Sequence, residues 1–361
     1  MAETIVVAMS GGVDSSVAAA ILKERGCNVI GIGLQLVDEE TSNVRLNSCC
    51  GIRDMDDARR AAQQLSIPFY ILNFKQVFRG AVIEYFIQSY LKGETPNPCI
   101  ACNEIVKFEA LWRICKGLRA SLLATGHYAR VVFDEQKKRY ILMKGVDKAK
   151  DQSYFLYSLS QYQLTHACFP LGGMTKEETR TLARSIGLRV HNKRESQDIC
   201  FVGGGGYGAL IQECAGERIK PGPILDENGK VIGMHKGIPF YTVGQRRGIG
   251  IPRPERMYVS DIDPENNTIT VTQSRDNLKR ARVFLEAVNY ISVACPDRPM
   301  KIVAKTRYGK PEMPALLLPL AHGKAIVEFL EPQETTAPGQ SVVFYCGDSV
   351  IGGGIARRSL F

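Results

Sequence analysis

The stretch Ser10-Gly11-Gly12-Val13-Asp14-Ser15-Ser16 decides the N-terminal fold, because it joins the apolar run 4–9 to a helix-like segment, 15–25. The glycines accept unusual φ angles and let the backbone approach a ligand. Backbone N–H groups here and at the helix start form an anion site, to which the serines add hydroxyl donors. A lone Gly-Gly would also fit an ordinary turn, but the whole string predicts a pyrophosphate loop with Asp14 able to hold Mg²⁺. It is not a Walker loop, since no Gly-Lys-Ser/Thr follows.

Strand-like and helix-like segments alternate on either side of this loop through the first 130 residues. This order predicts an α/β fold, a doubly wound parallel sheet with helices on both faces and ligands beyond the carboxyl ends of its strands. A further helix over 175–186 opens with Thr175 and Glu178 in a capping box. The expected strands are 29–36, 68–72 and 121–124, and the expected helices are 54–65, 77–91 and 105–117.

The texture of the sequence changes after Cys200, where four consecutive glycines, 203–206, suggest a linker. From about residue 217, Gly and Pro turns separate short β-rich runs, and strands at 302–306, 325–329 and 341–345 predict a small β-barrel. We therefore expect three domains: a catalytic α/β domain over 1–204, a small β-rich central domain over 205–278 and a C-terminal β-barrel over 279–361.

The bulk composition is that of a globular protein, with 361 residues, 45% of them apolar. The net charge of +9 favours a polyanionic partner without requiring one. No apolar run approaches the roughly 18 residues of a membrane span, and no basic segment with a cleavage site precedes the first strand. We expect a cytoplasmic protein with no membrane partner, whose 11 cysteines are not a disulfide framework.

Two groups of cysteines lie in polar surroundings. Residues 93–109 read GETPNPCIACNEIVKFE, so a proline-bracketed turn presents Cys99 and Cys102 ahead of a helix. Thiols near a helix N-terminus are more often thiolates, which are nucleophilic or bind metals. Cys200 lies among charged and polar neighbours that suit an accessible loop. A four-cysteine zinc site would need a second pair at short spacing, and the adjacent Cys49 and Cys50 are a poor chelating arrangement.

Several strings in one order make the chain resemble the tRNA-specific 2-thiouridylases, the MnmA family of the PP-loop ATP pyrophosphatases. The resemblance covers essentially the whole chain and implies that ATP adenylylates the C2 carbonyl oxygen of the wobble uridine in tRNA. Sulfur from an upstream persulfide or sulfide donor protein then displaces AMP. The implied cofactors are ATP and Mg²⁺. The matching strings are 10–16, 96–98 with Cys102-Asn103, 124–128, 150–156, 199–202 and 241–250.

The same resemblance implies roles for individual residues. Cys200 carries the persulfide, and Cys102 attacks it to free sulfide, leaving a Cys102–Cys200 disulfide that a reductant must reset. Without the family, Leu34 fits a plain core position, His127 a structural one, and 150–152 a solvated loop. The implied ATP contacts are Ala8, Met9, Ser10, Gly11, Gly12, Val13, Asp14, Ser15, Leu34 and Gly126. The implied tRNA contacts are Asn97 (at the target base), His127, Lys150, Asp151, Gln152, Arg307, Tyr308 and Gln340, with the central domain also on tRNA.

Cys99 departs from the family, in which many members have Asp at this position. The change creates three cysteines that could converge, Cys99, Cys102 and Cys200. Three thiolates suit a [4Fe–4S] cluster with one iron open for sulfide, as in other tRNA thiolases of this class. The sequence leaves the cluster and the persulfide–disulfide route open.

Two other readings compete with a tRNA thiolase. Another PP-loop thiolase or synthetase acting on a small substrate would be active without tRNA, and would leave the basic β-rich C-terminal half unexplained. A non-catalytic ATP-sensing or RNA-binding module disagrees with the intact loop and the intact cysteines at 102 and 200.

Overall fold

The computed structural model describes residues 2–37, 52–193, 199–202, 204–251 and 255–358. A parallel sheet forms the base of the N-terminal domain, with its strands in the order β3-β2-β1-β4-β7. This arrangement confirms the predicted parallel sheet. The strands are β1 Thr4–Ala8, β2 Asn28–Gln35, β3 Phe69–Asn73, β4 Leu122–Ala124 and β7 Ala167–Cys168.

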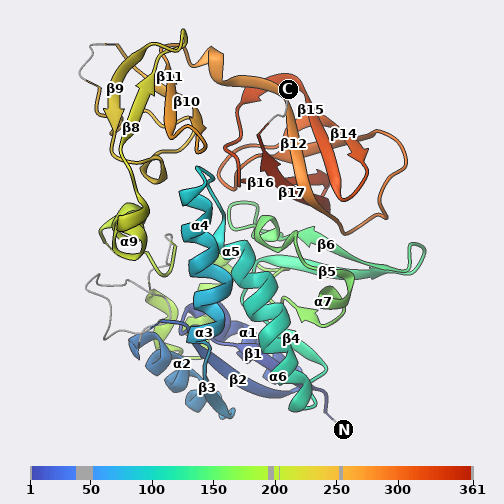
Figure 1. Cartoon of the computed structure of the whole chain (residues 1–361). Coiled ribbons are helices and arrows are strands. Elements are labelled where there is room, and N and C mark those ends of the chain that lie inside the picture. The colour runs from blue at the N-terminus through green and yellow to red at the C-terminus, as the bar shows by residue number, and fades with distance from the viewer. Residues whose placement is uncertain (1, 38–51, 194–198, 203, 252–254, 359–361) are drawn as a thin grey trace.

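Helices cover both faces of this sheet, as the alternation of strands and helices predicts (Figure 1). Alternate residues of β1 point into different cores, because side chains along a strand face opposite ways: Ile5 and Val7 enter one core and Val6 the other. The core around Val7 includes side chains of α1 Val13–Glu24, α2 Ile52–Gln64 and α8 Lys176–Ser185. The core around Val6 includes side chains of α3 Lys75–Phe78, η1 Arg79–Glu84, α4 Tyr85–Leu91, α5 Pro98–Ala101, η2 Cys102–Leu111 and α6 Trp112–Gly117.

The helix expected over 105–117 begins seven residues earlier, at Pro98, and runs through α5, η2 and α6. Proline suits the first position of a helix, because its φ is already helical and its missing N–H has no partner there. Cys99 and Cys102 therefore lie within the helix, and the expectation that they sit in a turn before it is wrong.

The central domain is a small sheet with its strands in the order β10-β11-β8-β9. Its core is built by β-branched and aliphatic residues, among them Val259, Ile262 and Val271. The helix α9 Gly206–Ala215 precedes the sheet and begins at the last of the four glycines. The strands are β8 Gly222–Leu225, β9 Val231–His235, β10 Tyr258–Asp263 and β11 Thr268–Thr272.

The C-terminal part is a closed barrel, as predicted from its short strands and turns. Its strands run β12-β15-β14-β13-β16-β17, and β12 pairs with β17 to close the ring. A hairpin of the N-terminal domain, β5 Ala129–Asp134 and β6 Arg139–Lys144, joins the barrel sheet where Met143 pairs with Ser349. The barrel strands are β12 Lys279–Tyr290, β13 Met300–Lys305, β14 Met313–Leu320, β15 Lys324–Glu334, β16 Ser341–Cys346 and β17 Ser349–Arg357.

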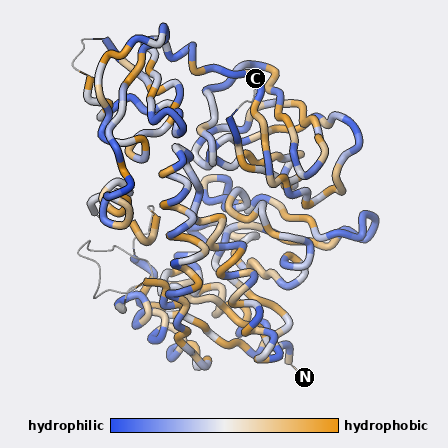
Figure 2. Tube along the Cα trace, in the orientation of Figure 1, coloured by the Kyte–Doolittle hydropathy of each residue, from blue (hydrophilic) through white to orange (hydrophobic). Residues whose placement is uncertain are grey.

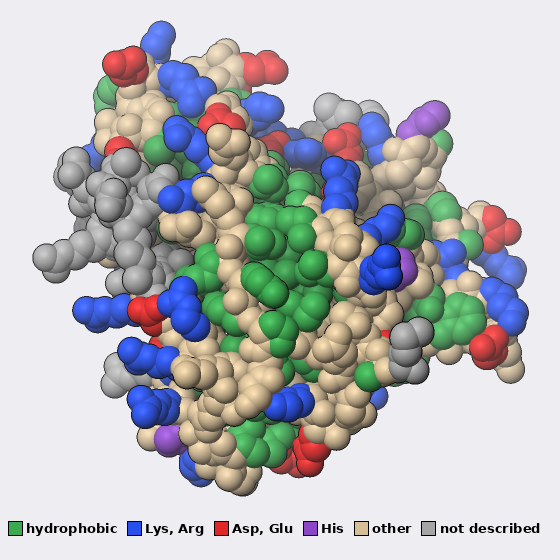
Figure 3. All heavy atoms as spheres, turned by 90° about the horizontal axis from the view of Figure 1, so that it is seen from below, with side chains coloured by type: hydrophobic (Ala, Val, Ile, Leu, Met, Phe, Trp, Pro, Cys, Tyr) green, Lys and Arg blue, Asp and Glu red, His purple; other side chains and the backbone are tan. Residues whose placement is uncertain are grey.

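The central domain and the barrel lie at the same end of the N-terminal domain, and α4 rises between them (Figure 1). Hydrophobic residues concentrate in the strands, whereas the tip of the β5–β6 hairpin is hydrophilic (Figure 2). Seen from the opposite end of the molecule, a central hydrophobic patch is surrounded by Lys and Arg side chains (Figure 3). Within the described ranges, no helix is long and apolar enough to cross a membrane.

Candidate active site

The loop between β1 and α1 has the geometry of an anion site. Gly12 precedes the first turn of α1 and receives no side-chain cap, so backbone N–H groups at this helix start are left for a ligand. Inside the loop, the Ser10 N–H donates to Ser15 Oγ at 3.2 Å, and Ser15 Oγ donates to the Gly12 carbonyl at 3.2 Å. Ser10 is exposed and Ser15 is buried. The serines therefore shape the loop as well as offering donors.

Two glycines allow the backbone to close tightly around this loop. Gly11 has a φ of +73°, and a Cβ there would lie 2.0 Å from the Asp54 carbonyl oxygen. A Cβ on Gly126, just after β4, would lie 2.7 Å from the Ser15 nitrogen. Gly126 therefore lies against the start of α1. The family resemblance implies that Gly126 contacts ATP, and this position is close to the pyrophosphate loop.

Not every implied ATP contact can use its side chain. Met9, Val13 and Leu34 are buried at 1%, 3% and 7% exposure, and their side chains belong to the two cores of the sheet. Only their backbone groups can reach a nucleotide at the sheet edge. Leu34 occupies a core position, as its apolar character alone would predict.

Asp14 is bound by two partners that the sequence did not reveal. Both of its carboxylate oxygens accept from Lys176 Nζ at 2.8 Å, and Oδ1 also accepts from the Tyr128 hydroxyl at 2.9 Å. Lys176 is 9% exposed and is the first residue of α8. A carboxylate has about four acceptor positions, so these bonds leave room for one more ligand. Mg²⁺ held mainly by phosphate oxygens and one carboxylate fits this donor set.

A second lysine closes the other side of the loop. Lys193 Nζ donates to the Gly11 carbonyl at 3.0 Å and to Asp57 Oδ2 at 2.6 Å, and it also pairs with Asp54. Burial lowers the pKa of Lys193, but hydrogen bonds to Asp54 and Asp57 outweigh burial and raise it above the usual value. Lys193 is therefore a fixed positive charge that ties the loop to α2. No pattern in the sequence marks Lys176 or Lys193.

The two cysteines expected to transfer sulfur belong to one side of the sheet. Cys102 is buried at 9% exposure in the core around Val6, and half-buried Cys200 packs against that same core. Phe201 anchors the Cys200 segment by edge contacts to Phe78 and Phe86, with ring centroids 5.6 and 5.3 Å apart. The polar residues 195–198 before Cys200 lie outside the described residues.

The described residues do not support the three-cysteine cluster. Among them, no group of three or more His, Cys, Asp or Glu side chains is placed to hold a metal ion, although Cys99, Cys102 and Cys200 are all described. Cys99 is exposed whereas Cys102 is buried, three residues further along the helix. The iron–sulfur cluster on these three cysteines therefore stays a prediction.

A polar network surrounds Cys102 at the start of the helix. Asn103 is 2% exposed, and its Nδ2 donates to the Phe155 carbonyl at 3.0 Å while its Oδ1 accepts from Lys107 Nζ at 2.9 Å. Asn97 lies just before the helix, half-buried, and makes no side-chain capping bond. Its amide therefore lies just before the helix that carries Cys99 and Cys102.

His127 does not carry the positive charge that a phosphate contact would use. Burial and then the charge of Lys107 hold its pKa well below the usual value. Its Nδ1 lies 2.7 Å from Thr125 Oγ1, and its ring contacts Phe169 edge-on at 6.0 Å. His127 is therefore neutral near pH 7 and can contact RNA only as a neutral donor or acceptor.

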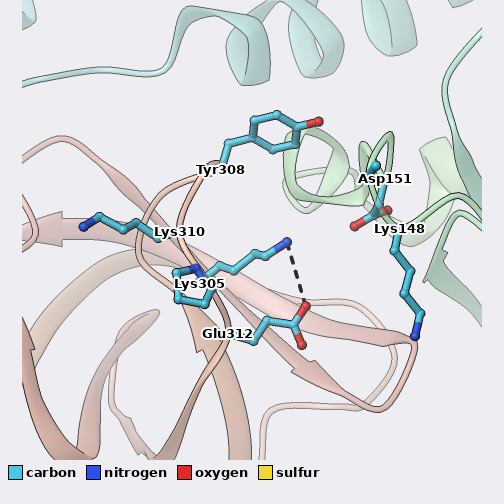
Figure 4. Close-up of a pocket in the computed structure, with 9 residues that line it drawn as sticks. Lys148, Asp151, Lys305, Tyr308, Lys310 and Glu312 are labelled. Atoms are coloured by element: carbon cyan, nitrogen blue, oxygen red, sulfur yellow. Dashed lines mark ion pairs between the residues drawn. The ribbon is translucent and has the colours of Figure 1, made fainter.

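Residues implied in tRNA binding meet at a hollow of about 480 Å³ between the 148–151 loop and the barrel (Figure 4). Tyr308 stands at one side, 38% exposed, with its ring 4.5 Å from that of Phe155. Arg307, beside it, is exposed. Three lysines that no sequence motif indicated, Lys148, Lys305 and Lys310, also line the hollow. Its charged and aromatic lining consists of Lys148, Asp151, Lys305, Tyr308, Lys310 and Glu312.

Asp151 and Gln152 have structural partners in this loop. Asp151 is 6% exposed and accepts from the Gly145 and Ser153 N–H groups, each at 3.1 Å. Gln152 Oε1 accepts from the Tyr128 N–H at 3.0 Å. The Asp151 carboxylate thus orders the loop, and a direct contact of Asp151 with tRNA stays a prediction. Lys150 is half-buried in the same loop.

Gln340 lies away from this hollow, against the segment that precedes the cysteines. Its Nε2 donates to the Thr95 carbonyl at 3.0 Å. The amide nitrogen therefore has an intramolecular partner, and a contact of Gln340 with tRNA stays a prediction.

Three family descriptions match the chain in succession. Residues 3–204 match a tRNA methyl transferase HUP domain, residues 209–273 a tRNA methyl transferase PRC-barrel domain, and residues 280–356 an aminomethyltransferase beta-barrel domain. Together they span almost the whole chain, in the order of the three parts of the structure.

Curated relatives match over nearly their full length. The tRNA-specific 2-thiouridylase MnmA of Moorella thermoacetica is 50% identical over 349 residues, which is 96% of this chain and 98% of the relative. That of Acetivibrio thermocellus is 48% identical over 98% of this chain and 99% of the relative. Among solved structures, a 4-thiouridine synthetase–RNA complex with bound ATP aligns with 17% identity over 55% of this chain and 45% of that chain, with a TM-score of 0.36. That match is too distant to carry an argument.

Proposed function

Because the chain belongs to the family of tRNA-specific 2-thiouridylases, MnmA, we propose that it is an ATP-dependent tRNA sulfurtransferase that makes 2-thiouridine at the wobble position. The observation that carries this proposal is that the pyrophosphate loop and the pair Cys102 and Cys200 belong to one domain, on one parallel sheet. An activating site and a sulfur-bearing site are the two parts that the reaction needs.

In the activating step, the uridine C2 oxygen attacks the α-phosphorus of ATP and pyrophosphate leaves. The N-terminus of α1, with the exposed Ser10, holds the leaving phosphates, while Gly126 allows the nucleotide to approach the backbone. Asp14 is the residue that would hold Mg²⁺, which neutralises phosphate charge when bound. Adenylylation turns a poor leaving group on the pyrimidine into AMP, a good one.

In the sulfur step, Cys200 receives sulfane sulfur from an upstream persulfide donor. Cys102 thiolate attacks the Cys200 Sγ of that persulfide, releasing hydrosulfide and forming a Cys102–Cys200 disulfide. The hydrosulfide attacks C2 and AMP departs with the former oxygen. A thiol reductant then restores both cysteines. For a reaction on tRNA we expect the protein to act in the cytoplasm.

The decisive test measures pyrophosphate release and 2-thiouridine together. The full chain is incubated with ATP, a low-molecular-weight persulfide and a transcribed tRNA, and the RNA is digested for mass detection of 2-thiouridine. We expect tRNA to stimulate pyrophosphate release and 2-thiouridine to appear only with ATP. Equal release without tRNA would instead support a synthetase that acts on a small substrate.

Single cysteine variants separate the two routes for sulfur. Cys102→Ser and Cys200→Ser should abolish thiolation while pyrophosphate release persists, and Cys346→Ser, an exposed cysteine of the barrel, should leave both unchanged. Cys99→Ser should retain activity. Loss of activity in Cys99→Ser together with iron and sulfide in anaerobically purified protein would contradict the persulfide route.

Binding of tRNA is proposed at the hollow beside the barrel. Exposed Tyr308 offers a ring for stacking on an unpaired base, and Arg307 and Lys148 offer charges for phosphates. The exposed Arg246 and Arg247 of the central domain are further candidates for phosphate contact.

A further inference from the structure

The segment Gly93–Asn97, which joins α4 to the cysteine-bearing helix, lies where all three domains meet. Figure 1 shows α4 ending between the central domain and the barrel. Gly93 has a φ of +69°, and a Cβ on it would lie 2.9 Å from Ile262 Cγ2 of the central domain. Thr95 Oγ1 bonds Thr242 Oγ1, also of the central domain, at 3.3 Å.

The barrel holds the same segment by its backbone. The Thr95 N–H donates to the Pro338 carbonyl at 2.7 Å, and the Thr95 carbonyl accepts from Gln340 Nε2 at 3.0 Å. Gly339, with a φ of +87°, fits so closely that a Cβ on it would lie 2.9 Å from Glu94 Cβ. Both backbone hydrogen-bonding groups of Thr95 are thus bound by the barrel.

A salt bridge to the barrel holds Glu94, the residue before Thr95. Arg357, at the end of β17, pairs with Glu94 and also bonds Glu286 Oε2 of β12 at 3.2 Å. Arg357 and Glu94 side chains are 35% and 24% exposed, so the pair is only partly open to water. Because Glu286 belongs to the barrel wall, the guanidinium links that wall to the segment.

This segment has little freedom to move independently of the cysteines. Asn97 follows Thr95 by two residues, Pro98 begins the helix, and Cys102 lies one turn further. A shift of Thr95 would therefore be transmitted along a helix to Cys102, whose side chain is buried. Among the described residues, no hydrogen bond joins this segment to the ATP loop that follows β1.

We propose that Arg357 and Gln340 of the barrel are positioning residues for sulfur transfer, which hold the Gly93–Asn97 segment so that Asn97 and Cys102 meet the activated base. The inference rests on the proposed thiolation. It makes the barrel a part of the sulfur step in addition to a surface for tRNA. Adenylylation depends on the loop at Ser10–Ser16 and should be affected much less.

The test compares the two half-reactions in full-length Arg357→Met and Glu94→Gln variants. We expect pyrophosphate release to stay within about twofold of wild type, while 2-thiouridine formed per pyrophosphate falls about tenfold or more, since small misplacements of reacting groups have effects of this size. The rate at which iodoacetamide modifies Cys102, followed by mass spectrometry of its peptide, should change in the same variants. The charge-exchanged double variant E94R/R357E should recover part of the lost thiolation.

Arg282→Met is the matched control, since Arg282 pairs with Glu328 on the outside of the barrel at 2.8 Å. It should change neither half-reaction. If Arg357→Met does not fold, as judged by thermal unfolding, Gln340→Met removes the side-chain bond to Thr95 and is read by the same two assays, with tRNA affinity measured alongside to separate a lost tRNA contact from a lost positioning bond. Equal loss of both half-reactions, or no loss in either, would overturn the inference. Failure of the wild-type protein to form 2-thiouridine would instead overturn the proposed function.

Discussion

At the scale of single residues, buried charge around the ATP loop is the feature with the largest energetic consequence. Lys176 and Asp14 lie 162 residues apart in sequence and pair at 2.8 Å, with Tyr128 completing the network. The Lys176 side chain is 11% exposed and that of Asp14 30%, so the pair is partly shielded from water and is tolerated there because it is paired and hydrogen-bonded. If either partner is removed alone, the charge of the other stays partly buried without a counter-charge, which lowers the free energy of unfolding.

Lys176→Met should therefore destabilise the protein by about 3 kcal/mol, because Asp14 loses its counter-charge. The measurement is urea unfolding at pH 7. Asp14→Asn combined with Lys176→Met should cost less than the two single changes added together, since the double variant buries no charge. Strict additivity would show that the two side chains do not act as a pair.

His127 predicts a dependence of stability on pH. Its pKa in the folded protein is held well below the usual value by burial and by Lys107, whereas the unfolded chain titrates near 6.5. Below about pH 6.5 the unfolded state binds a proton that the folded state does not, so stability falls as the pH falls. The His127→Asn variant has no titratable side chain at this position, so its unfolded state does not bind this proton.

The difference in unfolding free energy between wild type and His127→Asn should accordingly shrink from pH 8 to pH 5. Urea unfolding at both pH values measures it. A constant difference would mean that the folded protein protonates His127 normally. Carboxylates also titrate in this range, but they are common to both proteins and cancel in the difference.

At the scale of elements, α8 is the helix whose start matters to the site. Thr175 caps it with a full capping box: its Oγ accepts from the Glu178 N–H at 3.2 Å, and the Glu178 carboxylate accepts from the Thr175 N–H at 2.7 Å. Lys176 is the next residue, so the cap sets the direction in which the lysine leaves the helix.

Thr175→Ala should cost about 1 kcal/mol of stability through loss of the cap, and should also weaken ATP binding by displacing Lys176. Thr181→Ala, on the exposed face of the same helix, is the control and should not destabilise, because alanine is the better helix former. Denaturant unfolding and the ATP dependence of pyrophosphate release are the two measurements. If Thr175→Ala is destabilised but its ATP dependence is unchanged, the cap does not orient Lys176 for ATP binding.

At the scale of the whole molecule, the net charge of +9 favours a polyanionic partner, and three lysines line the hollow where tRNA binding is proposed. Arg307→Ala and Lys148→Ala should each weaken tRNA binding and lower the slope of log Kd against log salt by about 1, as for a lost phosphate contact. Arg113→Ala, on the exposed face of α6 at the opposite end of the molecule, should leave the slope unchanged. An unchanged slope in the first two variants would argue against phosphate contacts there.

Much of the fold follows from local patterns. The glycine loop, the β-branched run before it and the apolar spacing of 15–25 correctly predict β1 and α1, and the Thr175–Glu178 pair correctly predicts the start of α8. The barrel follows from short strands between turns. The β5–β6 hairpin was not expected, although its strands pair locally, and its attachment to β17 depends on a pairing more than 200 residues away in sequence.

The sequence by itself determined the pyrophosphate loop, the order of the elements and the cysteines available for sulfur transfer, because these depend on neighbours along the chain and on local backbone preference. Only the tertiary structure decided how Asp14 is neutralised, why His127 is uncharged, and that Cys99 and Cys102 lie within a helix. The tertiary structure also decided that the Gln340 side chain donates a hydrogen bond to the Thr95 carbonyl, 245 residues away in sequence. These features depend on which distant side chains share a desolvated space, and that is settled only when the three domains pack together.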